Sequence, residues 1–116
     1  METEVKTYSM RLNPEWFSLV RDGVKTFEGR AIKCEYKLGE VIEFTDMDRK
    51  ESFTTVISSI HIFRSFRKAF EVLGLEKTLP GIETIEEGVN VYRKYVSLET
   101  QERLGVYMLG LERYTL

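Results

Sequence analysis

The sequence is poor in the residues that most often build metal sites and disulfides. Its 116 residues include one cysteine and one histidine. A single cysteine cannot form a disulfide within the chain, which fits a reducing cytoplasm, and one histidine with one cysteine cannot build the usual zinc cluster. No apolar run approaches the roughly 18–20 residues of a membrane span, and the acidic residues 1–4 do not resemble a signal peptide. We therefore expect a cytoplasmic protein with no metal site and no membrane anchor.

The sequence also lacks a strong net charge, repeats and low-complexity segments. Seventeen Lys and Arg residues stand against nineteen Asp and Glu residues, a net charge of −2. This balance is not that of a strongly basic nucleic-acid binder, although a local basic patch can still bind. Positive charges gather in residues 25–37 and 64–77. Length and composition predict one globular domain, residues 1–116, which we expect to be a monomer.

Helix and strand signals alternate along the chain. Asn13 and Pro14 mark the start of one helix, Ser65 caps a second, and Thr84 begins a capping box for a third. Alternating and β-branched runs predict strands between these helices. We expect strands at residues 5–12, 26–30, 40–46, 51–62 and 105–114. We expect helices at residues 14–22, 66–73 and 85–96, and a short helical turn at 98–103.

The number and order of these elements limit the fold class. The strands are too few, and too often linked as hairpins, for a doubly wound parallel sheet. Five or so strands with inserted helices instead predict an α+β domain, built on a small twisted antiparallel sheet or a partly closed barrel.

The most polar stretch of the chain runs from Lys25 to Arg30. If it is extended, Thr26, Glu28 and Arg30 share one face of a strand, and Phe27 points to the other face. Such a strand can form one wall of a polar cleft. It can equally be an ordinary edge strand with a solvated ion pair, which contributes only ~0–1 kcal/mol.

The side chains of this stretch have complementary hydrogen-bonding roles. The carboxylate of Glu28 only accepts hydrogen bonds, and the planar guanidinium of Arg30 only donates them. Side by side they can read the edge of a nucleic-acid base, while Lys25 supplies a point charge for phosphate. Tyr92, Tyr95 and Phe63 offer stacking faces, unless they are simply core residues. No Gly-rich phosphate loop or nucleophile elbow is present, so we expect no cofactor.

Four stretches have a recognisable order and spacing. They are Pro14-x-Trp16-Phe17-x-x-Val20-x-x-Gly23-x-Lys25-Thr26-x-Glu28-x-Arg30, Leu38-Gly39-Glu40-Val41-Ile42-Glu43-Phe44, Phe63-Arg64-Ser65-Phe66, and Leu79-Pro80-Gly81 through Tyr92-Arg93. Together they resemble the ASCH domain family, a branch of the PUA-like superfamily. The resemblance implies a small PUA-like antiparallel β-barrel of about five to six strands, with two to three inserted helices.

The resemblance also implies a site and a partner. A cleft lined by the Lys-x-x-Glu-x-Arg motif would hold RNA or a nucleotide-like ligand. The expected binding residues are Lys25, Glu28, Arg30, Lys33, Arg64 and Ser65.

One branch of the family offers an alternative function, because its members are small amidohydrolases acting on N4-acetylcytidine. Lys25 matches the catalytic lysine of that branch, but Glu28 stands where the branch has a threonine. If the protein is a hydrolase on a modified nucleoside or on RNA, Lys25 and Glu28 are the expected catalytic residues. Glu28 would then act as a general base on water, a mechanism that differs from that of the branch with the threonine.

Overall fold

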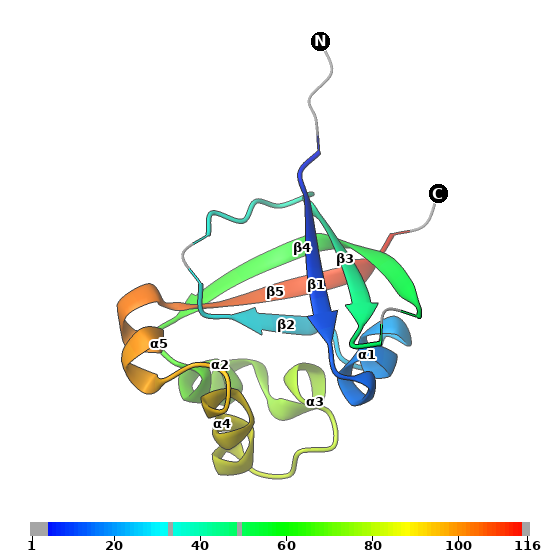
Figure 1. Cartoon of the computed structure of the whole chain (residues 1–116). Coiled ribbons are helices and arrows are strands. Elements are labelled where there is room, and N and C mark those ends of the chain that lie inside the picture. The colour runs from blue at the N-terminus through cyan, green and yellow to red at the C-terminus, as the bar shows by residue number, and fades with distance from the viewer. Residues whose placement is uncertain (1–4, 33, 49, 115–116) are drawn as a thin grey trace.

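Five strands of the described chain form one curled sheet that is open along one side. The computed structural model describes residues 5–32, 34–48 and 50–114. The order of strands across the sheet is β1-β3-β4-β5-β2 (Figure 1). The strands are β1 (Thr7–Leu12), β2 (Phe27–Arg30), β3 (Val41–Asp46), β4 (Ser52–Phe63) and β5 (Val106–Arg113). The predicted α+β class with a partly closed barrel is confirmed.

One strand pair departs from the antiparallel expectation. β3, β4, β5 and β2 pair antiparallel in that order, but β1 and β3 are parallel. After β1 the chain passes through α1 (Pro14–Arg21) and through β2 on the opposite edge before it returns as β3. A parallel pair requires such a crossover connection. The sheet therefore ends in two edge strands, β1 and β2, on either side of its opening.

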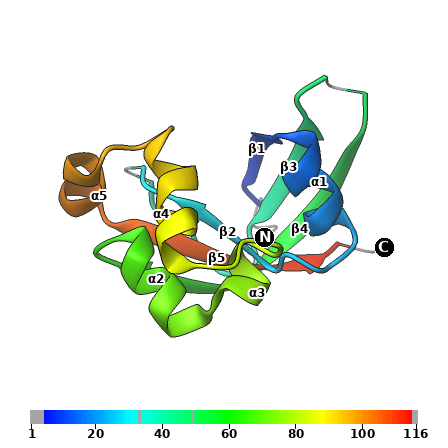
Figure 2. The same cartoon turned by 90° about the horizontal axis from the view of Figure 1, so that it is seen from below.

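Helices cover the barrel from two sides. Besides α1, the described residues form α2 (Phe66–Leu73), α3 (Leu75–Thr78), α4 (Ile85–Arg93) and α5 (Leu98–Leu104), which is more than the two to three expected. Seen from below, α1 lies beside β1 and β3, whereas α2, α4 and α5 gather on the other side (Figure 2). None of the helices in the described ranges is long and apolar enough to cross a membrane.

The caps explain where the helices begin. Ser65 accepts a hydrogen bond from the Lys68 amide and Thr84 accepts one from the Glu87 amide, as predicted. The predicted start of the first helix is confirmed, because Asn13 takes the N-cap position of α1 and Pro14 follows it. The side chain of Asn13 makes no capping hydrogen bond, however, and instead reaches across to Tyr95.

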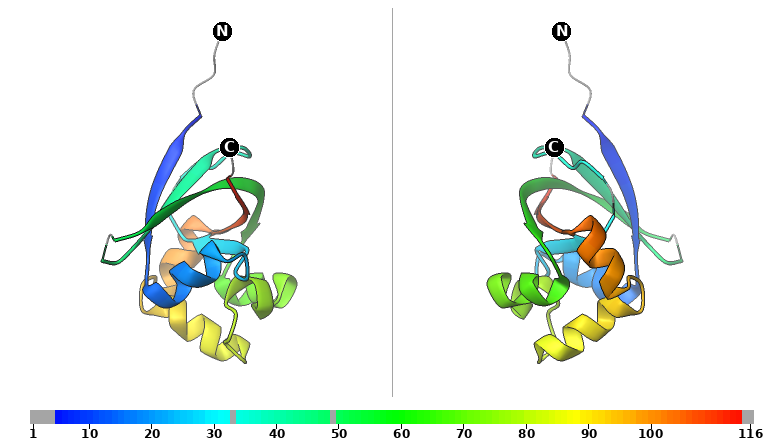
Figure 3. Two further views of the ribbon diagram at one scale, coloured as in Figure 1. Left: turned by 90° about the vertical axis from the view of Figure 1, so that its right-hand side faces the viewer. Right: turned by 90° about the vertical axis from the view of Figure 1, so that its left-hand side faces the viewer.

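Strand β5 separates two hydrophobic cores. Its side chains alternate, so Val106 and Met108 face the helices while Tyr107 and Leu109 face the barrel interior. Two views from the side show helices α2 and α4 at one end of the barrel and the start of β1 at the other (Figure 3). The barrel core is completed by Met10, Leu12, Phe17, Val20, Tyr36, Ile42, Phe44, Phe53 and Ile57. The helix-side core is completed by Phe66, Ala69, Phe70, Leu79 and Val89.

Candidate ligand-binding cleft

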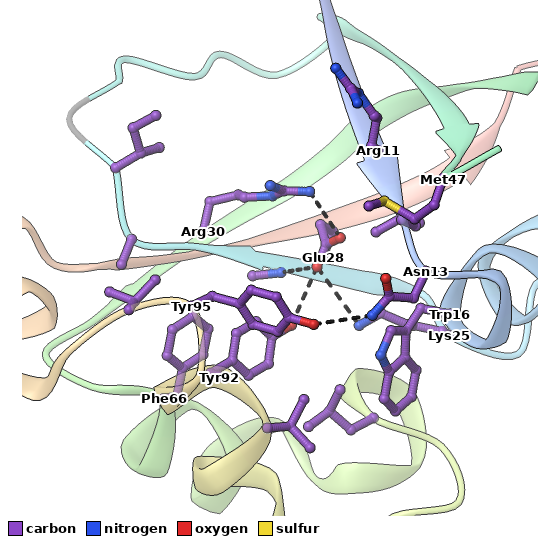
Figure 4. A pocket seen from close by; sticks show the side chains of 17 residues that line it. Arg11, Asn13, Trp16, Lys25, Glu28, Arg30, Met47, Phe66, Tyr92 and Tyr95 are labelled. Atoms are coloured by element: carbon purple, nitrogen blue, oxygen red, sulfur yellow. Dashed lines mark hydrogen bonds and ion pairs between the residues drawn. The ribbon is translucent and has the colours of Figure 1, made fainter. Parts of the chain in front are cut away.

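A cleft of about 590 Å³ lies at the opening of the sheet, where both edge strands approach the end of α4 (Figure 4). β1 contributes Arg11 and Leu12, and β2 contributes Glu28, Gly29 and Arg30. The helical side of the cleft consists of Asn13, Trp16, Phe66, Leu79, Val91, Tyr92, Tyr95 and Val96, with Lys25, Ala31, Ile32 and Met47 completing it. Its volume is within the roughly 300–1,000 Å³ typical of small-ligand sites.

Lys25 lies in the floor of the cleft and is only 2% exposed. Its Nζ donates to the carbonyl oxygen of Phe27 at 2.7 Å and to that of Thr78, and it is 4.0 Å from Glu28 Oε1. Burial lowers the pKa of Lys25, and the charge of Glu28 opposes this effect. Lys25 therefore ties β2 to α3 and supports Glu28 from below, rather than standing free for a phosphate.

Glu28 is fixed in one position by three donors and is 3% exposed. Its Oε1 accepts from the Gly29 amide at 2.9 Å and from the Tyr92 hydroxyl at 3.3 Å. Its Oε2 accepts from Arg30 Nη2 at 3.3 Å. Of the residues that the structure describes, only Arg30 donates to Oε2, so this oxygen can accept one more hydrogen bond.

Arg30 pairs with Glu28, as we expected for alternate residues of one strand (Figure 4). A third of its side chain is exposed. Its Nε is buried, yet it has no hydrogen-bond partner within the described part of the chain. Buried donors are nearly always paired in folded proteins, so this nitrogen is a donor in need of an acceptor.

Tyr92 connects the polar floor to the helix-side core. Its ring stacks on Phe66 with centroids 3.8 Å apart and planes inclined by 11°. Its hydroxyl faces Glu28, and burial together with that carboxylate raises the pKa of Tyr92 well above its ordinary value. The hydroxyl therefore stays protonated and donates to Glu28.

The outer wall of the cleft is closed by a contact between residues far apart in sequence. Asn13 Nδ2 donates to the Tyr95 hydroxyl at 3.0 Å. This bond joins the start of α1 to the turn after α4, and Tyr95 and Trp16 both line the cleft (Figure 4). Tyr95 is nevertheless 67% exposed, so its ring offers a fixed aromatic face to solvent.

Comparison with known proteins identifies the family of this domain. The sequence model of the ASCH domain matches residues 10–113. The chain belongs to the ASCH domain family. The resemblance carried by the Lys-x-x-Glu-x-Arg stretch and its neighbours is thereby confirmed.

Solved structures place this ASCH domain beside two near relatives. The crystal structure of the hypothetical protein PH0355 shares 32% identity, covers 93% of this chain and 99% of its own, and superimposes with a TM-score of 0.81. The solution structure of PF0455 from Pyrococcus furiosus shares 30% identity over 95% and 99% of the two chains, with a TM-score of 0.72. An ASCH protein from Zymomonas mobilis shares the fold at 17% identity and a TM-score of 0.67 over 95% of this chain and 69% of its own. None of the curated proteins matches the chain.

The cleft of this ASCH domain gathers only part of the predicted site. Lys25, Glu28 and Arg30 converge in it. Arg64 is exposed and Ser65 caps α2, and neither lines the cleft. Lys33 lies outside the described residues. Of the predicted stacking residues, Tyr92 and Tyr95 line the cleft and Phe63 does not.

Several cleft residues were missed by the sequence analysis. Arg11 lies on the edge strand β1, Met47 lies in the turn after β3, and Asn13 was assigned to helix capping. Trp16, Phe66 and Leu79, which also line the cleft, had a sequence signal, because they belong to the stretches that resemble the ASCH family. Within the described ranges, no group of three or more His, Cys, Asp or Glu side chains is placed to hold a metal.

Gly29 makes the close packing behind the cleft feasible. A Cβ atom at this position would lie 2.6 Å from Phe66 Cε1 and 2.8 Å from Met108 Sδ. We expect Gly29→Ala to lower the free energy of unfolding by about 1–3 kcal/mol, the range for overpacking a core. Urea unfolding followed by circular dichroism measures this change. In the double variant Gly29→Ala/Phe66→Leu, the loss of unfolding free energy should be smaller than the sum of the two single losses, because the ring atom that the added Cβ would meet is gone. Strict additivity of the two losses would contradict a clash between the Cβ added at position 29 and Phe66.

The buried tyrosines of this domain predict a loss of stability at high pH. Burial raises the pKa of Tyr36 to about 12, and the pKa of Tyr92 is also raised. Because both lie above the unfolded value of about 10, their contribution to stability is complete below pH 10 and is lost as the pH rises through the folded-state values. We expect the free energy of unfolding to fall between pH 10 and 12. The stability of Tyr92→Phe, measured by urea titration, should fall less steeply than that of the wild type over this range. Equal slopes would rule out a raised pKa of Tyr92 in the folded state.

Proposed function

We propose that this ASCH domain binds the base of a nucleotide in its cleft, either as a free nucleotide or within single-stranded RNA. One observation carries the proposal: a fixed acceptor, Glu28, lies beside an incompletely paired donor, Arg30, within one aromatic-walled cleft. A ligand that fits this arrangement has a flat aromatic body with donors and acceptors along its edge. Nucleic-acid bases are the common biological ligands of this kind.

The hydrogen-bonding pattern favours bases that carry an exocyclic amine. Such an amine can donate to the remaining lone pair of Glu28 Oε2. The guanidinium of Arg30, a third of whose side chain is exposed, can then donate to an acceptor of the same ligand. Cytosine and adenine carry an amine next to a ring acceptor, whereas uracil has a carbonyl in the corresponding place. We therefore expect this cleft to prefer cytosine and adenine to uracil.

The local charge of the cleft suits a phosphorylated ligand. Three cationic side chains, Arg11, Lys25 and Arg30, line it together with a single carboxylate, Glu28. Lys25 is occupied by carbonyl oxygens, which leaves Arg11 and Arg30 to meet a phosphate group. The overall charge of −2 is thus compatible with an attractive site, because the nearby charges dominate.

The same geometry supports binding in preference to hydrolysis. A catalytic lysine must be able to reach the substrate. Lys25 Nζ is engaged by two carbonyl oxygens, whereas Glu28 Oε2 keeps one lone pair for a hydrogen bond from the base. Lys25 therefore forms part of the floor of the cleft, and Glu28 binds the base.

Trp16 provides a direct test, because it is the only tryptophan in the sequence and lines the cleft. We expect cytidine and adenosine 5′-monophosphates to change its fluorescence in a saturable manner, and uridine 5′-monophosphate to do so only at higher concentration. Arg30→Gln should weaken the response, and the matched control Arg64→Gln, away from the cleft, should not. No response to any nucleotide, or equal loss in both variants, would refute the proposal.

A further inference from the structure

We propose that the ligand of this domain is a single strand of at least two nucleotides, with the second nucleotide in a neighbouring pocket beyond Tyr95. This inference rests on the proposed function of the first cleft. It concerns the pocket next to the cleft, because a ligand that also fills this pocket must be a strand and not a free nucleotide.

The second pocket adjoins the first. It has a volume of about 340 Å³ and lies between α1, the loop at residues 80–82 and the end of α4. Trp16, Val91 and Tyr95 line both hollows, so the same side chains form the wall between them. Its size is near the lower end of the range for a small-ligand site, which is enough for one more flat ring.

The wall between the pockets is aromatic and fixed in place. Among the residues that the structure describes, Tyr95 is the most exposed of the large apolar side chains, at 67%. Its hydroxyl is nonetheless held by Asn13, so the exposed ring does not need to be ordered when a ligand arrives. Fixed aromatic faces on which successive bases stack are the common feature of single-strand binding sites. A free nucleotide in the first cleft would leave the side of Tyr95 that faces the second pocket unused.

Cations line both pockets. Arg11 and Arg30 line the first pocket and Lys94 lines the second. Glu15 also lines the second pocket, so the charge there is mixed rather than strongly basic. A ligand with one phosphate can meet the cations of one pocket, whereas a strand that carries a phosphate on each nucleotide can meet those of both.

The test compares ligands that differ by one nucleotide. Isothermal titration calorimetry with cytidine 5′-monophosphate and with the 5′-phosphorylated RNA dinucleotide pCpC, which carries one more phosphate, gives the ratio of the two dissociation constants. We expect the dinucleotide to bind at least tenfold more tightly. In Tyr95→Ala this ratio should shrink to about threefold or less. Tyr95→Phe keeps the ring but loses the hydroxyl that Asn13 holds, so its ratio should lie between those of Tyr95→Ala and the wild type.

Charge is tested by a matched pair of lysine variants. Lys94→Gln should reduce the ratio, whereas Lys68→Gln on the exposed face of α2 should leave both affinities unchanged. Equal affinity of the wild type for the monophosphate and the dinucleotide would overturn the strand inference and leave the proposed function standing. Failure of both ligands to bind would overturn both. If the dinucleotide still binds more tightly than the monophosphate in both Tyr95→Ala and Lys94→Gln, the second pocket is not the cause of the tighter binding and the inference is overturned.

Discussion

Replacing Lys25 with methionine is expected to lower the free energy of unfolding by about 3–5 kcal/mol, the cost of removing one partner from a buried charged pair. The ammonium satisfies two carbonyl oxygens, of Phe27 and Thr78, and lies beside the buried carboxylate of Glu28. Methionine fills a similar volume but donates no hydrogen bond, so both carbonyl oxygens lose a partner and Glu28 loses its neighbouring positive charge. Urea unfolding monitored by circular dichroism measures the change.

A second lysine nearby provides the control for this substitution. Lys77 lies on α3 next to Thr78, but it is exposed. Lys77→Met should therefore alter stability by less than about 0.5 kcal/mol, as surface substitutions usually do. If Lys25→Met unfolds at the same urea concentration as Lys77→Met, then Lys25 does not support the floor of the cleft. Glu28 would then not depend on Lys25 for its position in the cleft, which would also contradict the proposed role of Glu28.

The second large effect is expected for Glu28→Gln on ligand choice. Glutamine has nearly the same shape, but its amide carries donors and can turn either end toward the ligand. We expect the affinity for cytidine 5′-monophosphate to fall by about 1–3 kcal/mol, the range for a lost hydrogen bond to a charged group, and the preference over uridine 5′-monophosphate to vanish. Titrations of Trp16 fluorescence with both nucleotides measure this.

Glu43 supplies a matched control because it lies exposed on β3, away from the cleft. Glu43→Gln should bind both nucleotides as the wild type does. Incubation of each variant with N4-acetylcytidine separates binding from hydrolysis. A wild-type protein that releases cytidine, and a Glu28→Gln variant that still binds but releases none, would favour the hydrolase over the binding module. Unchanged affinity and unchanged preference in Glu28→Gln would show that this carboxylate does not read the base.

The sequence predicted those parts of this domain that local signals determine. Ser65 and Thr84 cap their helices through hydrogen bonds to residues three positions ahead, and the residue types alone identify such caps. The pairing of Glu28 with Arg30 follows in the same way from the alternation of side chains along one strand.

Contacts between distant segments could not be predicted in this way. The residue type of Asn13 and its place before Pro14 indicate a helix start. They do not reveal its partner Tyr95, which lies 82 residues further along the chain. Arg11 and Met47 enter the cleft because β1 pairs with β3 across a crossover, a choice that no short pattern encodes. Gly29 lies in the expected strand at 26–30, and no short pattern indicates that the ring of Phe66, from another element, leaves no room for a side chain there. These are features of tertiary packing, and they shape most of the site.

The most direct test of the nucleotide-binding cleft is to map where a nucleotide binds by the amide chemical shifts of the labelled protein. Titration with cytidine 5′-monophosphate is predicted to move the signals of residues 11–16, 28–32 and 91–96, which surround the cleft from three separate segments. Shifts confined to the region of Arg64 and Ser65, or no shifts at millimolar nucleotide, would contradict the assignment of this cleft as the binding site.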